Sequence, residues 1–162
     1  MSIEDPYSKL RPPEPTPEEE LCACPDSPPI LLRSTLGPNP LACARCNLEV
    51  RPEALPLPAE LAEALAAWRS FHDCFYLLWL DSAEFEDWGR AQLSDPTSPV
   101  NSRGLGLRQR LEPIRRTFFW WFQDVGAADF RPLAACPICS SNLLDRELVG
   151  RVCDDCSVLV AN

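Results

Sequence analysis

Near its C-terminal end the sequence reads Cys136-Pro-Ile-Cys139 and, after thirteen further residues, Cys153-Asp-Asp-Cys156. A tight turn with two residues between its cysteines directs both sulfurs to one side, where a single ion can reach them. Two such turns supply four thiolates, and thirteen residues are enough for a short β-hairpin between them. The spacing therefore predicts a zinc ribbon in which four cysteines hold Zn²⁺ at about 2.3 Å.

A second set of four cysteines lies in the N-terminal part of the chain. It consists of Cys22-x-Cys24 and, after eighteen residues, Cys43-x-x-Cys46. We therefore expect two four-cysteine sites and two zinc ions per chain. Cys-x-Cys is the less usual spacing, so the sequence leaves open whether Cys22 or Cys24 is a bystander. Reduced structural cysteines or a redox pair are the alternatives for either set.

The residue after the second cysteine of such a turn often has a positive φ, which favours Gly. Here the three followers are Asn47, Ser140 and Ser157. Asn tolerates the left-handed region better than Ser does. We therefore expect less ideal turns at the C-terminal site.

Between the two cysteine sets the pattern changes to helical spacing. Apolar residues three or four apart predict a helix over 59–80. In Asp81-Ser-Ala-Glu84 the acid lies three residues after Asp81, which is capping-box spacing and predicts a second helix from there to Leu93. Ser98-Pro99 is a good N-cap and first helical residue for a third helix, to about Glu112. The β-branched and aromatic run over 117–123 predicts a strand.

These patterns predict an α+β protein in which two four-cysteine zinc-ribbon β-hairpin modules bracket a central region of about three helices. Thirteen of the eighteen prolines precede Ala59, which supports a boundary there. The expected segments are an acidic, Pro-rich disordered tail (1–20), an N-terminal zinc ribbon (21–58), a helical region (59–116), and an aromatic strand with the C-terminal zinc ribbon (117–162).

The composition limits the classes of function. The 162 residues include 24 acidic and 15 basic side chains, a formal charge of −9, and this sign excludes a uniformly basic nucleic-acid-binding surface. The sequence contains no run of about 18 apolar residues, the length that a membrane span requires. The first ten residues contain no apolar stretch typical of a secretion signal. We therefore expect a cytoplasmic protein with reduced thiols and no membrane partner.

Cys74 is the ninth cysteine and His72 is the only histidine. Residues two apart do not face each other on a helix, so a Cys–His nucleophile pair is not expected. We expect Cys74 to be a buried free thiol and His72 to be a hydrogen-bonded core residue. Closed four-thiolate sites leave no open coordination position for a substrate. The sequence shows no catalytic motif elsewhere. We therefore expect no enzyme and identify no small-molecule substrate.

Positive charge is concentrated in residues 96–116, which carry five arginines and one acid. The aromatic run 118–122 follows directly, and arginine beside aromatic rings suits single-stranded nucleic acid. The favoured alternative is a solvated helix face followed by a core strand. The candidate nucleic-acid-binding residues are Arg103, Arg108, Arg110, Arg115 and Arg116.

Several strings occur in a characteristic order. They are Leu41-Ala-Cys43-Ala-Arg-Cys46, Leu55-Pro-Leu-Pro58, Ala67-Trp68, Leu77-Leu-Trp-Leu-Asp-Ser82, Gln92-Leu-Ser-Asp95, Phe118-Phe-Trp-Trp121 and the C-terminal cysteine motifs. In this order they resemble a bacterial family of uncharacterised double zinc-ribbon proteins described as candidate nucleic-acid-binding proteins. The resemblance implies zinc at both cysteine sets. This chain departs from the family pattern in lacking tyrosines at 118–120 and a Gly after Cys139.

The acidic composition, the two closed sites and the lack of a catalytic constellation favour one function. It is a zinc-binding, non-enzymatic bacterial cytoplasmic protein that acts as a protein-interaction module with a protein partner. One alternative is a nucleic-acid-binding zinc-ribbon protein that uses the segment Arg103–Arg116. A further alternative, an acidic immunity-type neutraliser of a toxin, rests on charge and size alone.

Overall fold

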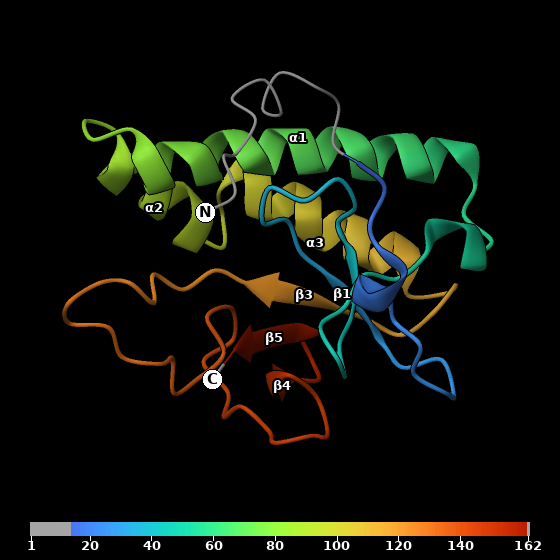
Figure 1. Ribbon diagram of the computed structural model, residues 1–162. Coiled ribbons are helices and arrows are strands. Elements are labelled where there is room, and N and C mark those ends of the chain that lie inside the picture. Colours follow the sequence, from blue (N-terminus) through green and yellow to red (C-terminus); the bar gives the residue numbers. More distant parts are fainter. Residues whose placement is uncertain (1–13, 162) are drawn as a thin grey trace, which may run out of the picture.

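The computed structural model describes residues 14–161, which form an α+β fold (Figure 1). Residues 1–13 of the expected tail lie outside the described residues, and Glu18–Glu20 form one 3-10 turn. The α-helices of the described part are α1 (Ala59–Asp81), α2 (Glu86–Ser94) and α3 (Pro99–Leu111). All three lie on the same side of the sheet. No helix in residues 14–161 combines the length and the apolar character that a membrane span requires.

Helix α1 buries one stripe of side chains. The stripe comprises Leu61, Leu65, Trp68, His72 and Phe75. These residues are three or four apart, which places them on one face of a helix. The expected first helix is therefore present.

Helices α2 and α3 are joined by a network of caps. Ser98 Oγ accepts a hydrogen bond from the N–H of Asn101 at 3.3 Å, as expected for an N-cap. The buried amide of Asn101 donates to the carbonyls of Leu93 (2.9 Å) and Asp95 (2.8 Å) at the end of α2. One side chain thus pairs with two carbonyls at and just beyond the C-terminal end of α2.

Helix α2 begins later than expected. Ser82 Oγ accepts from the N–H of Phe85 at 3.1 Å, but Ser82 is also the C-cap of α1. Because α1 continues to Asp81, the connection between the helices needs 83–85, and α2 starts at Glu86. The predicted cap at Asp81 does not form, because Asp81 is the last residue of α1, and α2 begins about one turn later than predicted.

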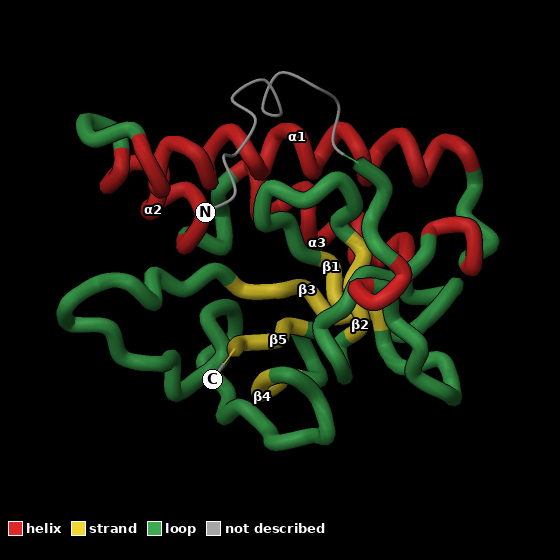
Figure 2. Tube along the Cα trace, in the orientation of Figure 1, coloured by secondary structure: helices red, strands yellow, loops and turns green. Residues whose placement is uncertain are grey.

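The sheet has five strands in the order β2-β1-β3-β5-β4 (Figure 2). They are β1 (Ile30–Leu32), β2 (Leu41–Cys43), β3 (Thr117–Trp121), β4 (Gly150–Cys153) and β5 (Val158–Ala161). Each cysteine set contributes an antiparallel hairpin, β1–β2 or β4–β5. Strand β3 pairs in parallel with β1 on one side and with β5 on the other. The two hairpins therefore belong to one mixed sheet.

Alternate residues of the strands pack on opposite faces of the sheet. Phe119 and Trp121 join the core formed with α1 and α3, whereas Phe118 packs with Leu31 and Leu159 on the other face. The ring of Trp68 lies edge-on to Phe119 at 5.9 Å between centroids. Both faces of β3 are thus buried, which explains its unbroken aromatic sequence.

Two further segments pair only at single residues. The segment 48–50 forms isolated bridges at Glu49, and 143–144 forms a bridge at Leu144. The helical aromatics are not all core residues, because Phe85 is 53% and Trp88 50% exposed.

Two candidate metal centres and the arginine segment

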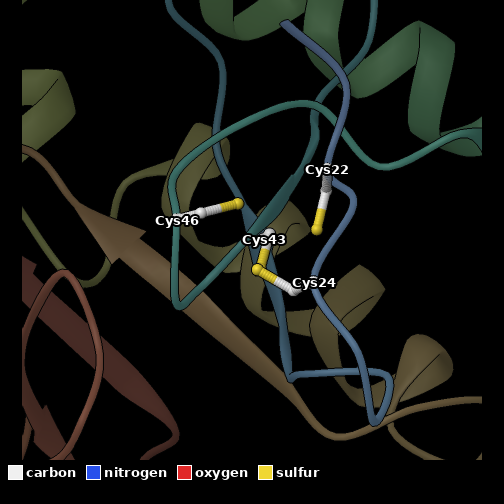
Figure 3. Close-up of side chains that lie close together, drawn as sticks. All are labelled: Cys22, Cys24, Cys43 and Cys46. Atoms are coloured by element: carbon white, nitrogen blue, oxygen red, sulfur yellow. The ribbon is translucent and has the colours of Figure 1, made fainter. Parts of the chain in front are cut away.

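The structure brings the eight paired cysteines together as two clusters of four. Within each cluster the four sulfur atoms lie within 4.8 Å of one another. Figure 3 shows the first cluster, with its sulfurs turned toward a common centre. The clusters are Cys22, Cys24, Cys43 and Cys46, and Cys136, Cys139, Cys153 and Cys156.

The turn that begins at Cys43 has a defined hydrogen-bond pattern. The N–H of Cys43 donates to the carbonyl of Leu48 at 2.8 Å, and the N–H of Asn47 donates to the carbonyl of Cys43 at 2.8 Å. The N–H of Arg45 donates to the Sγ of Cys43 at 3.4 Å. This last bond stabilises negative charge on the sulfur.

The turn that begins at Cys136 repeats this pattern. Its N–H donates to the carbonyl of Ser141 at 2.8 Å, and the N–H of Ser140 donates to the carbonyl of Cys136 at 2.9 Å. The N–H of Ile138 donates to the Sγ of Cys136 at 3.4 Å. In the third turn Cys153 is likewise paired with Val158, five positions on.

The residue after each second cysteine has a positive φ. The angles are 63° at Asn47, 63° at Ser140 and 54° at Ser157. The expectation of less ideal turns at the C-terminal site is therefore wrong, because both serines adopt the left-handed conformation. At Ser140 this conformation is held by the hydrogen bond from its N–H to the carbonyl of Cys136.

Cys22 and Cys24 reach their cluster without such a turn. Leu21 forms a bridge with Glu49, and the N–H of Cys22 donates to the carbonyl of Glu49 at 2.7 Å. In an extended segment the side chains at i and i+2 point to the same side. Ala23 is accordingly exposed while both cysteines are half-buried. The structure thus brings both sulfurs into the cluster.

The sulfur geometry suits a tetrahedral ion. Four sulfurs at about 2.3 Å from a central Zn²⁺ would be about 3.8 Å apart. The Sγ atoms of Cys139 and Cys153 are 3.6 Å apart. Thiolate sets of this kind select soft or borderline metals, zinc foremost. Each cluster can therefore hold one metal ion, and zinc fits the donor set.

The raised pKa values of two cysteines also favour a bound cation. Burial, with added contributions from Cys43 and Cys46, raises the pKa of Cys22 to about 12. Burial and the neighbouring thiols likewise raise the pKa of Cys156. Thiols packed this closely cannot all ionise together unless a positive ion compensates them. A bound dication would supply that compensation.

Ser141 is a site residue that sequence reasoning missed. Hydrogen bonds from its side chain and its backbone lower the pKa of Cys139 to about 6. The available signal was its position two residues after the second cysteine of the turn, where the backbone folds back toward the sulfur.

The two clusters differ in exposure. In the first, Cys43 is buried and the others are half-buried against the core. In the second, Cys139 is exposed. Solvent therefore reaches the second cluster more easily than the first.

Two single residues of α1 differ from expectation. Cys74 is exposed, so the prediction of a buried free thiol is wrong; its Sγ donates to the carbonyl of Ser70 at 3.3 Å. His72 is buried, as expected, between the rings of Trp68 and Tyr76. We expected a hydrogen-bonded histidine, but its Nδ1 has no hydrogen-bond partner in the described part of the chain. Burial lowers the pKa of His72 to about 4.

The candidate arginines separate into two groups. Arg108 and Arg116 both contact Glu112, each at 2.9 Å. Arg116 also lies over the ring of Phe118 at 4.5 Å from its centroid. Arg115 lies beside them in the connection to β3 and is half-buried. Arg108 and Arg116 are therefore largely engaged within the protein.

Arg103 and Arg110 form the second group, on another face of α3. Arg103 lies over the ring of Phe71, 4.6 Å from its centroid, and Arg110 is 3.6 Å from Glu60. The aromatic run that follows offers little surface for stacking, because Phe118, Phe119 and Trp121 are all buried. The structure thus places the five arginines on two separate surfaces.

Comparisons of this chain with protein-family models, with curated proteins and with solved structures find no match. The two four-cysteine clusters are consistent with zinc-ribbon sites. What supports the resemblance to zinc-ribbon proteins is therefore the geometry of these clusters.

Proposed function

We propose that this chain is a zinc-binding, non-enzymatic protein that acts as a protein-interaction module. The observation that carries the proposal is the pair of closed four-cysteine clusters. One includes Cys43 of the edge strand β2, and the other includes Cys153 of the edge strand β4. Metal held by four protein ligands stabilises a fold and leaves no position for a substrate.

The arrangement of the arginines supports a protein partner over nucleic acid. Arg108 and Arg116 share Glu112, which neutralises part of the charge that phosphates would need. The buried rings of β3 cannot stack on bases. A chain with a net charge of −9 is better suited to a protein partner than to a polyanion.

Metal analysis of the purified full-length protein tests the first half of the proposal. We expect about two zinc ions per chain, and loss of secondary structure on chelation because the metal contributes to folding. Zero zinc in protein purified without chelator would overturn it.

Two assays test the second half. Photo-crosslinking in cells, with the crosslinker placed in turn on several exposed positions, should give a defined protein adduct at one surface. Anisotropy with a labelled 20-nucleotide single strand should show no binding at low salt. Binding that falls steeply with salt and is lost in Arg108→Glu with Arg115→Glu would replace the proposal by nucleic-acid binding.

A further inference from the structure

A groove of about 400 Å³ lies between α1 and α3. Two core residues, Trp68 and Leu107, line it and provide an apolar surface. On the α1 side it is bordered by Ala64 and Ala67, whose short side chains leave the space between the helices unfilled. These four residues therefore give the groove an apolar lining.

Gly106 lines the same groove from α3. A Cβ atom added to Gly106 would meet no heavy atom within 4 Å, whereas one added to Gly104 would lie 2.3 Å from Phe119. Gly104 is thus needed for close packing of α3 on β3, but nothing in the described fold requires Gly at 106. Gly in a helix interior costs about 1 kcal/mol relative to Ala, so the internal packing does not explain this residue.

Arg103 and Arg110 also line the groove. They are seven residues apart on α3, which corresponds to about 10 Å along a helix axis. No carboxylate within residues 14–161 forms an ion pair with Arg103. Among the described residues, Arg110 forms an ion pair with Glu60 alone, at 3.6 Å, and the side chain of Glu60 is 90% exposed. Two cations with weak internal pairing therefore border an apolar groove.

We propose that this groove binds an amphipathic helix of a partner protein. The helix presents an apolar stripe to Trp68 and Leu107 and carries two carboxylates about seven residues apart, opposite Arg103 and Arg110. An apolar groove between two helices receives a third helix through side chains at i, i+3, i+4 and i+7. The small residues at 64, 67 and 106 allow its backbone to approach closely. This inference rests on the proposed function, since it names the surface and the partner class of that module.

A designed peptide provides the probe. It is a labelled 20-residue helix with a leucine stripe and two glutamates seven residues apart, and its control has lysine in place of both glutamates. With full-length zinc-loaded protein, anisotropy at low salt should show the glutamate peptide binding about tenfold more tightly than the lysine peptide. High salt should reduce that difference.

Protein variants locate the binding site. Gly106→Leu fills the groove and should weaken binding at least about tenfold, with zinc content and circular dichroism unchanged. Ala91→Leu, at an exposed position of α2, is the matched control and should bind normally. Arg103→Glu with Arg110→Glu should reverse the preference, so that the lysine peptide binds more tightly.

Three results would overturn the inference. One is equal binding of both peptides with no effect of Gly106→Leu. Another is binding of decanoate without binding of either peptide, which would make the groove a site for small carboxylates. The third is peptide binding only after removal of residues 1–13, which would assign the groove to the chain's own N-terminal segment.

The outcomes also separate this inference from the proposed function. A crosslinked cellular partner that persists in Gly106→Leu leaves the interaction function standing and removes the groove from it. Peptide binding with the predicted charge preference, together with no cellular adduct from any surface, would leave the groove standing as a binding site for an acidic helix. The same result would count against the interaction function in cells.

Discussion

Replacing Gly104 by Ala should destabilise the protein, although Ala is the better helix former. Gly104 lies where α3 crosses β3. The added Cβ would be 2.3 Å from Cε2 of Phe119 and 2.9 Å from Nε1 of Trp68. Carbon atoms in contact are normally about 3.5–4.0 Å apart, so the Phe119 ring would have to move by more than about 1 Å.

The magnitude follows from how firmly Phe119 is held. Its side chain is 2% exposed and packs edge-on against Trp68 and Trp121. Overpacking of a core costs about 1–3 kcal/mol, and a clash this short with a confined ring belongs at the upper end. Replacing Gly by Ala in a helix stabilises the helix by about 1 kcal/mol, which offsets part of this cost. The expected net loss in the free energy of unfolding is therefore about 2 kcal/mol.

Gly106→Ala is the matched control, because a Cβ there meets nothing within 4 Å. It should stabilise the protein by about 0.5–1 kcal/mol through helix propensity alone. Urea unfolding of both zinc-loaded variants, followed by tryptophan fluorescence, measures the difference. With an m-value of about 2 kcal/mol/M, Gly104→Ala should lower the midpoint by about 1 M. Equal midpoints for the two variants would refute the close approach of α3 to β3.

Three further predictions concern single side chains. Burial lowers the pKa of His72 from 6.5 to about 4, so its contribution to stability is complete above pH 6.5 and is lost as the pH falls toward 4. At saturating zinc, the free energy of unfolding of the wild type should fall by about 2 kcal/mol more between pH 7 and pH 5 than that of His72→Phe. Urea unfolding measures both, and an equal fall in the two proteins would contradict the prediction. Ser98→Ala removes the N-cap of α3 and should cost about 1 kcal/mol in the same assay, whereas Ser102→Ala, at an exposed position, should cost little. Cys139→Ser should reduce bound zinc from two ions to one, while Cys74→Ser keeps both; unchanged zinc in Cys139→Ser would remove that residue from the ligand set.

The local features of this fold are visible in the sequence because they depend on short spacings. The Cys-x-x-Cys turns, the N-cap at Ser98 and the apolar stripe of α1 each involve residues only a few positions apart. The exposure of Cys74 follows from the same periodicity. A helix turns about 100° per residue, so Cys74 lies about 200° from His72, on the opposite face. Placing His72 in the core already places Cys74 outside it.

The pairing of β3 with both hairpins could not be predicted in this way. Parallel partners of Thr117 and Phe119 lie in β1 and β5, and no spacing in the sequence specifies which strands meet. The division of the arginines was only partly visible. Glu112 lies four residues from both Arg108 and Arg116, which indicates ion pairs, but the groove beside Arg103 depends on how α1 crosses α3.

The central position of β3 has a consequence for the kinetics of folding. Ile30 pairs with Thr117, and the loop closed by that pairing contains all three helices. Non-local parallel pairings of this kind form slowly, because the loss of chain entropy precedes the gain in contacts. Each cysteine hairpin, by contrast, closes only a short loop. We therefore expect a refolding chain to capture metal in both hairpins first and to reach the complete sheet in a slower step, when β3 enters between them.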